Sequence, residues 1–231
     1  MTAYFIAGTD TEIGKTFVTC ALLHAARARG LSAVGMKPIA AGADLVGGEL
    51  INEDAARLRA AGSFDPGLAL LNPYCLKSPI APHIAAAEEG VAIDPAPILA
   101  AFAKLQAQAE LVLVEGVGGF RVPLGKGYDT ADLARDLALP VILVVGMRLG
   151  CINHALLTAQ AIRARGLALA GWVGNTVDAT QPHQADNLTA LADRLNAPCW
   201  GVVPRLGGSA PGAADVASHL NTAELHTALL A

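Results

Sequence analysis

Near its amino terminus the sequence carries glycine, lysine and hydroxyl residues at a spacing suited to binding a chain of phosphates. The segment is GTDTEIGKT, residues 8–16. Glycines let backbone N–H groups wrap phosphate oxygens at the start of a helix, where Lys15 would reach the β and γ phosphates and the Thr16 hydroxyl would bind Mg²⁺. Five residues separate Gly8 from Gly14, one more than in the common pattern, so this is a variant loop. The alternative is a plain glycine turn, but Gly-Lys-Thr between a strand and a helix favours nucleotide binding.

Two carboxylates are placed where they could complete a magnesium site. Glu115 ends the apolar run LVLVEG, and Asp54 lies near the start of an expected helix. With the Thr16 hydroxyl they would supply oxygen ligands to a hydrated octahedral ion. For Asp54 an equally good interpretation is a first-turn acid favoured by the helix dipole.

Lys37 is the most informative charge outside the loop. It ends a second apolar run in GMKPIAAG, and the following Pro38 favours an extended backbone. The ammonium group is therefore expected to point across the strand ends toward the γ phosphate. The alternative is a solvated lysine, which would more usually lie on a helix face.

Two glycine-containing segments offer backbone groups for a ligand. The cluster at residues 116–119 does not match a dinucleotide fingerprint, and either allows a close approach of backbone to ligand or simply turns. Residues 150–153 begin an expected helix, whose free N–H groups could bind a carboxylate. A nucleophile or metal pair made by Cys151 and His154 is disfavoured, because no other cysteine or histidine is near in the sequence.

Short apolar runs alternate with longer Ala-rich segments of helical spacing, which predicts an α/β fold. The runs lack alternation, as strands buried on both faces do, so we expect a doubly wound, mostly parallel sheet flanked by helices. The expected strands are 4–7, 33–36, 111–114, 141–145, 169–173 and 200–203. Helices are expected over 15–29, from about Asn52, from Pro95 with Asp94 as cap, from a cap at Thr130, over 152–165 and from Pro182. Residues 63–82 are too irregular for a helix and predict a long functional loop, and after Pro204 we expect a loop with one or two small helices.

Composition limits the remaining possibilities. The length of 231 residues predicts a single domain, residues 1–231. A net charge of -4 without any Lys/Arg run argues against nucleic acid. The most apolar stretch, residues 137–147, is too short to cross a membrane, and the amino terminus lacks the pattern of a signal peptide, so we expect a cytoplasmic protein.

Across most of the chain up to about residue 206, the sequence resembles the dethiobiotin synthetases of biotin biosynthesis, which have a fold of the P-loop NTPase type. The combination of motifs is more specific than a phosphate loop alone. The matching segments are GTDTEIGKT at 8–16, GMKPIAAG at 35–42, NPYCLKSPIAPHIAAAEEG at 72–90, LVLVEGVGGFRVPL at 111–124, LPVILVVGMRLGCINHALLTAQ at 139–160 and LAGWVGNTV at 169–177.

The resemblance implies an ATP- and Mg²⁺-dependent ligase that closes a ureido ring. Its substrates would be 7,8-diaminopelargonate, CO₂ and ATP, and its products dethiobiotin, ADP and phosphate, formed through a carbamate and a carbamic-phosphoric anhydride. It also implies a homodimer in which backbone around residues 150–153 of the other subunit holds the substrate carboxylate.

The same resemblance implies a set of site residues. Catalysis would involve Lys37, Lys15 and Thr11, and Mg²⁺ would be bound by Thr16, Asp54 and Glu115. The nucleotide would contact Glu12, Ile13, Gly14, Lys15, Thr16, Phe17, Asn175, Thr176, Pro204, Arg205 and Leu206. The substrate would contact Thr11, Lys37, Ala41, Glu115, Gly118, Gly150, Cys151 and Asn153. Two departures stand out: Ala41 replaces a common hydroxyl residue, and residues 207–214 contain no acid for a ribose contact.

Three other functions share the phosphate loop. A partition-type ATPase switch would carry an extra lysine early in the loop, and residues 9–13 contain none. An amide ligase of cobalamin synthesis shares the phosphorylated-carboxylate chemistry but fits the GCINH and NPY segments less well. A nucleotide-binding module without catalysis is the third alternative.

Overall fold

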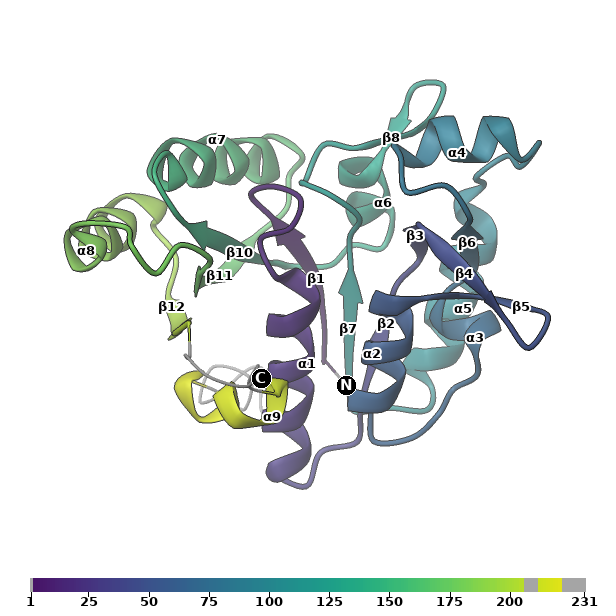
Figure 1. Cartoon of the computed structure of the whole chain (residues 1–231), viewed down its shortest axis with the longest axis horizontal. Coiled ribbons are helices and arrows are strands. Elements are labelled where there is room, and N and C mark those ends of the chain that lie inside the picture. The colour runs from purple at the N-terminus through teal and green to yellow at the C-terminus, as the bar shows by residue number, and fades with distance from the viewer. Residues whose placement is uncertain (1, 206–211, 222–231) are drawn as a thin grey trace.

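The central element of the computed structural model is a parallel six-stranded sheet (Figure 1). The structure describes residues 2–205 and 212–221. Strand order across the sheet is β12-β11-β10-β1-β7-β2. The strands are β1 (Thr2–Gly8), β2 (Ala33–Met36), β7 (Leu111–Glu115), β10 (Val141–Met147), β11 (Leu169–Thr176) and β12 (Cys199–Val203). All six predicted strands are confirmed, and the predicted α/β class with them.

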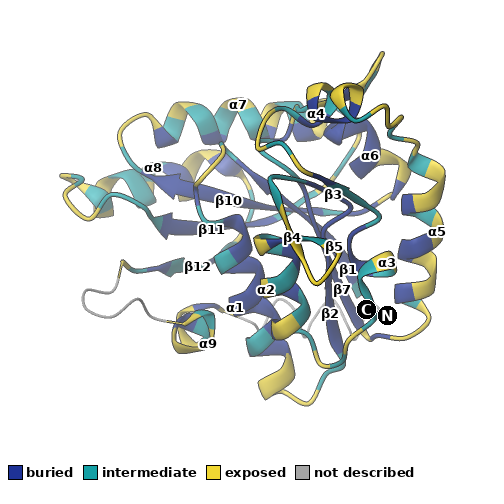
Figure 2. Ribbon diagram, turned by 45° about the vertical axis from the view of Figure 1, so that its right-hand side comes forward, coloured by how far each residue is buried: buried dark blue, intermediate teal, exposed yellow. Residues whose placement is uncertain are grey.

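Helices cover both faces of the sheet, which explains the apolar composition of the strands (Figure 2). Successive residues of β1 enter opposite cores: Phe5 packs with side chains from α5 to α8, whereas Ile6 packs with those of α1 and α2. The helices are α1 (Lys15–Ala28), α2 (Glu53–Ala61), α5 (Pro95–Gln106), α6 (Thr130–Asp136), α7 (Cys151–Ala164) and α8 (Gln184–Leu195). Within the residues described, none is long and apolar enough to cross a membrane.

Helix starts follow the predicted capping chemistry with two corrections. Asn52 caps α2 and Asp94 caps α5, as predicted. The cap of α6 is Asp129 rather than Thr130, because the Asp129 carboxylate accepts from the first-turn N–H groups while the Thr130 hydroxyl donates to the Phe120 carbonyl. Helix α8 begins at Gln184, two residues after the predicted start at Pro182.

The segment 63–82 contains more regular secondary structure than predicted. It contains a one-turn helix, α3 (Leu68–Leu71), and a strand, β6 (Tyr74–Leu76). Strand β6 pairs in parallel with β3 (Ile39–Ala41) outside the main sheet, and this non-local pairing could not be read from local sequence pattern. The smaller elements are completed by β4 (Ala43–Val46), β5 (Glu49–Asn52), α4 (Pro82–Glu88), β8 (Pro123–Gly125) and β9 (Tyr128–Asp129).

After Pro204 the described residues contain two short helices, α9 (Ala213–Val216) and the 3-10 helix η1 (Ala217–His219). Both pack against α1, as Figure 1 shows for α9. The expectation of one or two small helices after Pro204 is confirmed for this part. Leu206 and the rest of 206–211 lie outside the described residues, as do 222–231.

Candidate functional site

The predicted phosphate loop joins β1 to α1. Gly14 adopts a left-handed conformation, φ 80°, directly before the helix. A Cβ atom there would lie 2.2 Å from Nδ2 of Asn175, which donates a hydrogen bond of 2.8 Å to the Ile13 carbonyl. Lys15 curls over the loop and its Nζ donates to the Asp10 carbonyl at 3.1 Å. The loop is therefore braced from β11, directly before the start of α1.

A buried group of charges lies beside this loop, at the carboxyl ends of β2 and β7. The Nζ of Lys37 is 2.6 Å from Oε1 of Glu115 and 2.9 Å from Oδ2 of Asp54. The Thr16 hydroxyl donates to the same Oε1 of Glu115 at 2.7 Å. Exposed fractions of the Lys37 and Glu115 side chains are 4% and 0%. Residues distant in sequence thus meet where the sequence analysis expected them, because carboxyl ends of parallel strands share one edge.

Electrostatics favour the charged forms of Lys37 and Asp54. Burial lowers the pKa of Lys37, but the neighbouring Glu115 and Asp54 carboxylates outweigh burial and raise it above the usual value. Burial raises the pKa of Asp54, and the Lys37 ammonium reverses this and holds it low. Lys15 lacks such a close carboxylate, so burial and then repulsion by Lys37 lower its pKa to about 8. A phosphate chain would supply the negative charge that Lys15 lacks.

The residues present fit a hydrated divalent cation. Within the described residues, the buried Oε2 of Glu115 has no hydrogen-bond partner. Asp54 is 39% exposed at its side chain and reaches the adjacent pocket, and the Thr16 hydroxyl lies between loop and carboxylate. Two carboxylates and a hydroxyl leave other positions for water and phosphate oxygens, which suits Mg²⁺. The described residues contain no cluster of three or more His, Cys, Asp or Glu side chains able to hold a metal.

A pocket of about 350 Å³ brings half of the predicted site residues together, without Ile13 and Glu115 in its lining. Its lining contains predicted residues from the phosphate loop, from the end of β3 and from the loop after β7. Four further lining residues were not predicted as site residues: Ala40, Asn52, Arg57 and Val117. The lining comprises Thr11, Glu12, Gly14, Lys15, Thr16, Phe17, Lys37, Ala40, Ala41, Asn52, Asp54, Arg57, Val117 and Gly118. Asn52 could have been found from its capping position before Asp54, but Arg57 carries no distinguishing sequence signal.

Other predicted residues lie apart from this pocket. Gly150, Cys151 and Asn153 line a different pocket of about 470 Å³ at the start of α7. Of the residues predicted near adenine, Asn175 braces the loop, whereas Thr176 accepts a hydrogen bond from Gln184. Arg205 donates to the carbonyl of Val177, and Pro204 precedes it at the end of β12.

The sheet order, the strand-to-helix phosphate loop and the helices on both faces define the P-loop NTPase class. Solved structures of that class are similar to this chain over most of its length. The MinD cell division protein of Aquifex aeolicus gives a TM-score of 0.57 at 16% identity, covering 99% of this chain and 95% of that chain. A ParA family ATPase from Chlorobium tepidum gives 0.57 at 11% identity, covering 99% and 98%. At such identities the likeness concerns the fold alone.

Sequence comparisons place the chain within this class more narrowly. A family described as an AAA domain matches residues 2–211. A protein of Aromatoleum aromaticum named ATP-dependent dethiobiotin synthetase BioD is 69% identical over 218 residues, 94% of this chain and 96% of the relative. A protein of the same name from Ralstonia nicotianae is 52% identical over 221 residues, 96% of each chain. The chain belongs to the dethiobiotin synthetase family, which confirms the predicted resemblance and the enzyme class, an ATP-dependent ligase.

Proposed function

We propose that this protein closes the ureido ring of dethiobiotin from 7,8-diaminopelargonate, CO₂ and ATP, with release of ADP and phosphate. The observation that carries the proposal is the buried Lys37 ammonium, held between Glu115 and Asp54 beside the phosphate loop and facing the pocket. Family membership supports the use of ATP and dethiobiotin as the product, since the relatives are named ATP-dependent dethiobiotin synthetases.

The reaction needs charge stabilisation more than acid-base catalysis. One substrate amine attacks CO₂ and loses a proton to give a carbamate, and a carbamate oxygen then attacks the γ phosphorus while the bond to ADP breaks. The second amine attacks the carbamic-phosphoric anhydride, closing the ring as phosphate leaves with the bonding electron pair and the amine proton is lost to solvent. Lys15 and Lys37 would gather the negative charge that the phosphoryl oxygens carry. Both amines belong to one molecule, so proximity favours ring closure.

Mg²⁺ would be held by Thr16, Asp54 and Glu115, and it would neutralise phosphate oxygens. Thr11 and Glu12 line the pocket above these groups, where they would contact substrate and nucleotide. Ala41 and Gly118 also line the pocket, and Ala41 offers no hydroxyl to the substrate. For the base and ribose we retain Phe17, Asn175, Thr176, Pro204 and Arg205 as candidates.

A homodimer would account for the second pocket. The pocket at the start of α7 does not share lining residues with the phosphate-loop pocket, and next to it the Leu149 side chain is 93% exposed. Leu157, on the same helix, is 57% exposed. We propose that a second copy covers this face and brings the helix start at residues 150–153 to the substrate carboxylate. We further propose that residues 1–231 act as one domain in the cytoplasm.

The decisive assay measures phosphate release and dethiobiotin by mass. We expect phosphate release from ATP only when diaminopelargonate, bicarbonate and Mg²⁺ are all present, with dethiobiotin formed in equal amount. Vigorous ATP turnover without substrate and without dethiobiotin would instead favour a switch ATPase. Titration with ATP, CTP and GTP in the same assay tests the base contact, since equal use of all three would contradict base recognition by Asn175.

A further inference from the structure

The backbone at Lys37 is held from outside the main sheet. Strand β2 pairs with β7 only as far as Met36. The Lys37 N–H donates to the Leu71 carbonyl at 2.8 Å, and the Lys37 carbonyl accepts from Nδ2 of Asn72 at 2.6 Å. Both backbone groups of Lys37 are therefore bonded to the junction between α3 and β6.

The Asn72 side chain links two segments of the chain outside the main sheet, one just after β2 and the other at the start of β6. The Asn72 residue is 7% exposed, and its Nδ2 also donates to the Tyr74 carbonyl at 3.1 Å. The Tyr74 N–H in turn donates to the Pro38 carbonyl at 3.0 Å, and Tyr74 starts the pairing of β6 with β3. One buried amide thus links the Lys37 carbonyl, just after β2, to the Tyr74 carbonyl at the start of β6.

This arrangement matters because two of the groups that hold the Lys37 ammonium, Glu115 and Asp54, are the carboxylates proposed to bind Mg²⁺. The ammonium bonds to Glu115, to Asp54 and to the Gly116 carbonyl. When phosphate or metal enters, those bonds must rearrange, whereas the backbone bonds to Leu71 and Asn72 need not change. A buried carbonyl that loses its donor is costly, so the amide restricts where the Lys37 backbone can settle.

We propose that Asn72 is a positioning residue for Lys37: it holds the lysine backbone so that the ammonium reaches the reacting phosphoryl group. The proposal rests on the function proposed above for Lys37. The proposal also gives a role to the long segment 63–82. Its first residue, Ser63, is bonded to the start of β2. The Ser63 hydroxyl accepts from the Ala33 N–H at 2.9 Å, at the start of β2. Segment 63–82 therefore contacts both ends of β2, and only the Asn72 end adjoins Lys37.

The test compares Asn72→Leu and Asn72→Ser with Ser63→Ala as the matched control. Loss of the amide should lower kcat for dethiobiotin formation by roughly ten- to a hundredfold, as small misplacements of catalytic groups do. Asn72→Ser keeps one donor and should fall between Leu and wild type. The Kd for ATP should change by less than about twofold, because the loop at residues 8–16 is untouched. Ser63→Ala should lower the melting temperature without this loss of kcat.

A double-mutant cycle with Lys37→Met then separates positioning from general destabilisation. If Asn72 acts through Lys37, Asn72→Leu should change the residual kcat of the Lys37→Met enzyme by less than about twofold, measured by single-turnover incorporation of labelled bicarbonate. Equal losses in both backgrounds would overturn the proposal, as would Asn72 variants no slower than Ser63→Ala. If Asn72→Leu does not fold, Asn72→Ser decides by the same comparison. A wild-type protein that forms no dethiobiotin would instead contradict the proposed function itself.

Discussion

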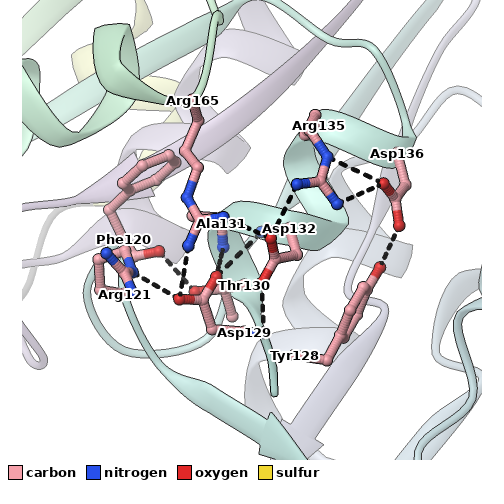
Figure 3. Close-up of polar contacts among 10 residues, drawn as sticks. All are labelled: Phe120, Arg121, Tyr128, Asp129, Thr130, Ala131, Asp132, Arg135, Asp136 and Arg165. Carbon is pink, nitrogen blue, oxygen red and sulfur yellow. Dashed lines mark hydrogen bonds and ion pairs between the residues drawn. The ribbon is translucent and has the colours of Figure 1, made fainter.

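Two regions of the molecule concentrate its scarce charges, and they are built differently. One is the site group of Lys37, Asp54, Glu115 and Thr16 described above. The other, which we call the α6 cluster, surrounds the start of α6 (Figure 3). The cluster contains Arg121, Tyr128, Asp129, Asp132, Arg135, Asp136 and Arg165. Each region joins segments distant in the sequence through ion pairs.

In the α6 cluster the carboxylates serve the local fold. Asp129 and Asp132 form the capping box of α6 and also pair with Arg165, at 3.4 and 2.6 Å. Arg121 pairs with Asp129 while its own side chain stays 58% exposed. Asp129 and Asp132 are buried, but both are bonded to backbone N–H groups and to arginines that stay partly exposed, so the cluster needs no further ligand. Its role is to tie the end of α7, the start of α6 and the loop after β7 together.

In the site group Lys37 and Glu115 are buried while Asp54 is part-exposed, and one carboxylate oxygen, Oε2 of Glu115, lacks a partner among the described residues. A pocket of about 350 Å³ is lined by the other three members of the site group, Lys37, Asp54 and Thr16. Burying an ion costs free energy unless its charge is paired and its hydrogen bonds are satisfied. A buried and incompletely bonded group therefore points to ligand binding. Bonding state and burial, rather than the number of ion pairs, therefore distinguish the catalytic region from the α6 cluster.

The largest effect is expected from Lys37→Met, which removes the central charge of the site group and keeps a side chain of similar length. We expect kcat for dethiobiotin formation to fall about 10³-fold, since cations that stabilise phosphoryl transfer contribute on this scale. The Kd for ATP, measured with a fluorescent analogue, should change by no more than about threefold. Lys104→Met, on the exposed face of α5, is the control. A kcat within about tenfold of wild type would contradict the role assigned to Lys37.

The next largest effect is expected from Glu115→Gln. This change removes a buried negative charge from beside Lys37 and halves the carboxylate ligands offered to Mg²⁺. The Mg²⁺ concentration for half-maximal activity should rise about a hundredfold, and unfolding free energy should drop by roughly 3 kcal/mol because a buried ion pair loses one partner. Calorimetry and an Mg²⁺ titration measure the two. Asp65→Asn, in the exposed pair with Arg59, is the control; equal losses in both variants would remove the distinction drawn between buried and exposed pairs.

Much of the site could be predicted because it depends on local signals and on one topological rule. The loop at 8–16 has its own composition, and Lys37 and Glu115 end apolar runs, so a parallel sheet necessarily brings them to one edge. Asp54 had two equally good interpretations, and its 2.9 Å contact with Lys37 favours the site. Asn72 could not be placed, because its bond to Lys37 depends on the pairing of β3 with β6 across 35 positions of sequence.

A smaller effect is expected at the loop itself, from Gly14→Ala. The left-handed φ of 80° is unfavourable for alanine, and its Cβ would lie 2.2 Å from Nδ2 of Asn175. The Asn175 brace must move, so the Kd for ATP should rise about tenfold, equivalent to ~1.4 kcal/mol of strain. Titration of the fluorescent ATP analogue measures it. Gly47→Ala is the control, because φ there is also positive but no atom lies within 4 Å of the added Cβ. An equal loss of ATP affinity in both variants would contradict the role assigned to the Asn175 contact, because backbone strain alone would then be sufficient to lower affinity.

The smallest effect on catalysis is expected from Arg165→Met, in the α6 cluster. Its guanidinium bonds to Asp129 and Asp132, and the side chain is 25% exposed, so water can replace part of what is lost. Stability should decrease by about 1 kcal/mol, as for partly exposed ion pairs. Because Arg165 neither lines the pocket nor touches the site group, kcat should stay within about twofold of wild type. Denaturant unfolding and steady-state assays on the same preparation measure both. A kcat loss comparable to that of Glu115→Gln would show that the α6 cluster is coupled to the site through the loop after β7, and the two regions would then have to be treated as one.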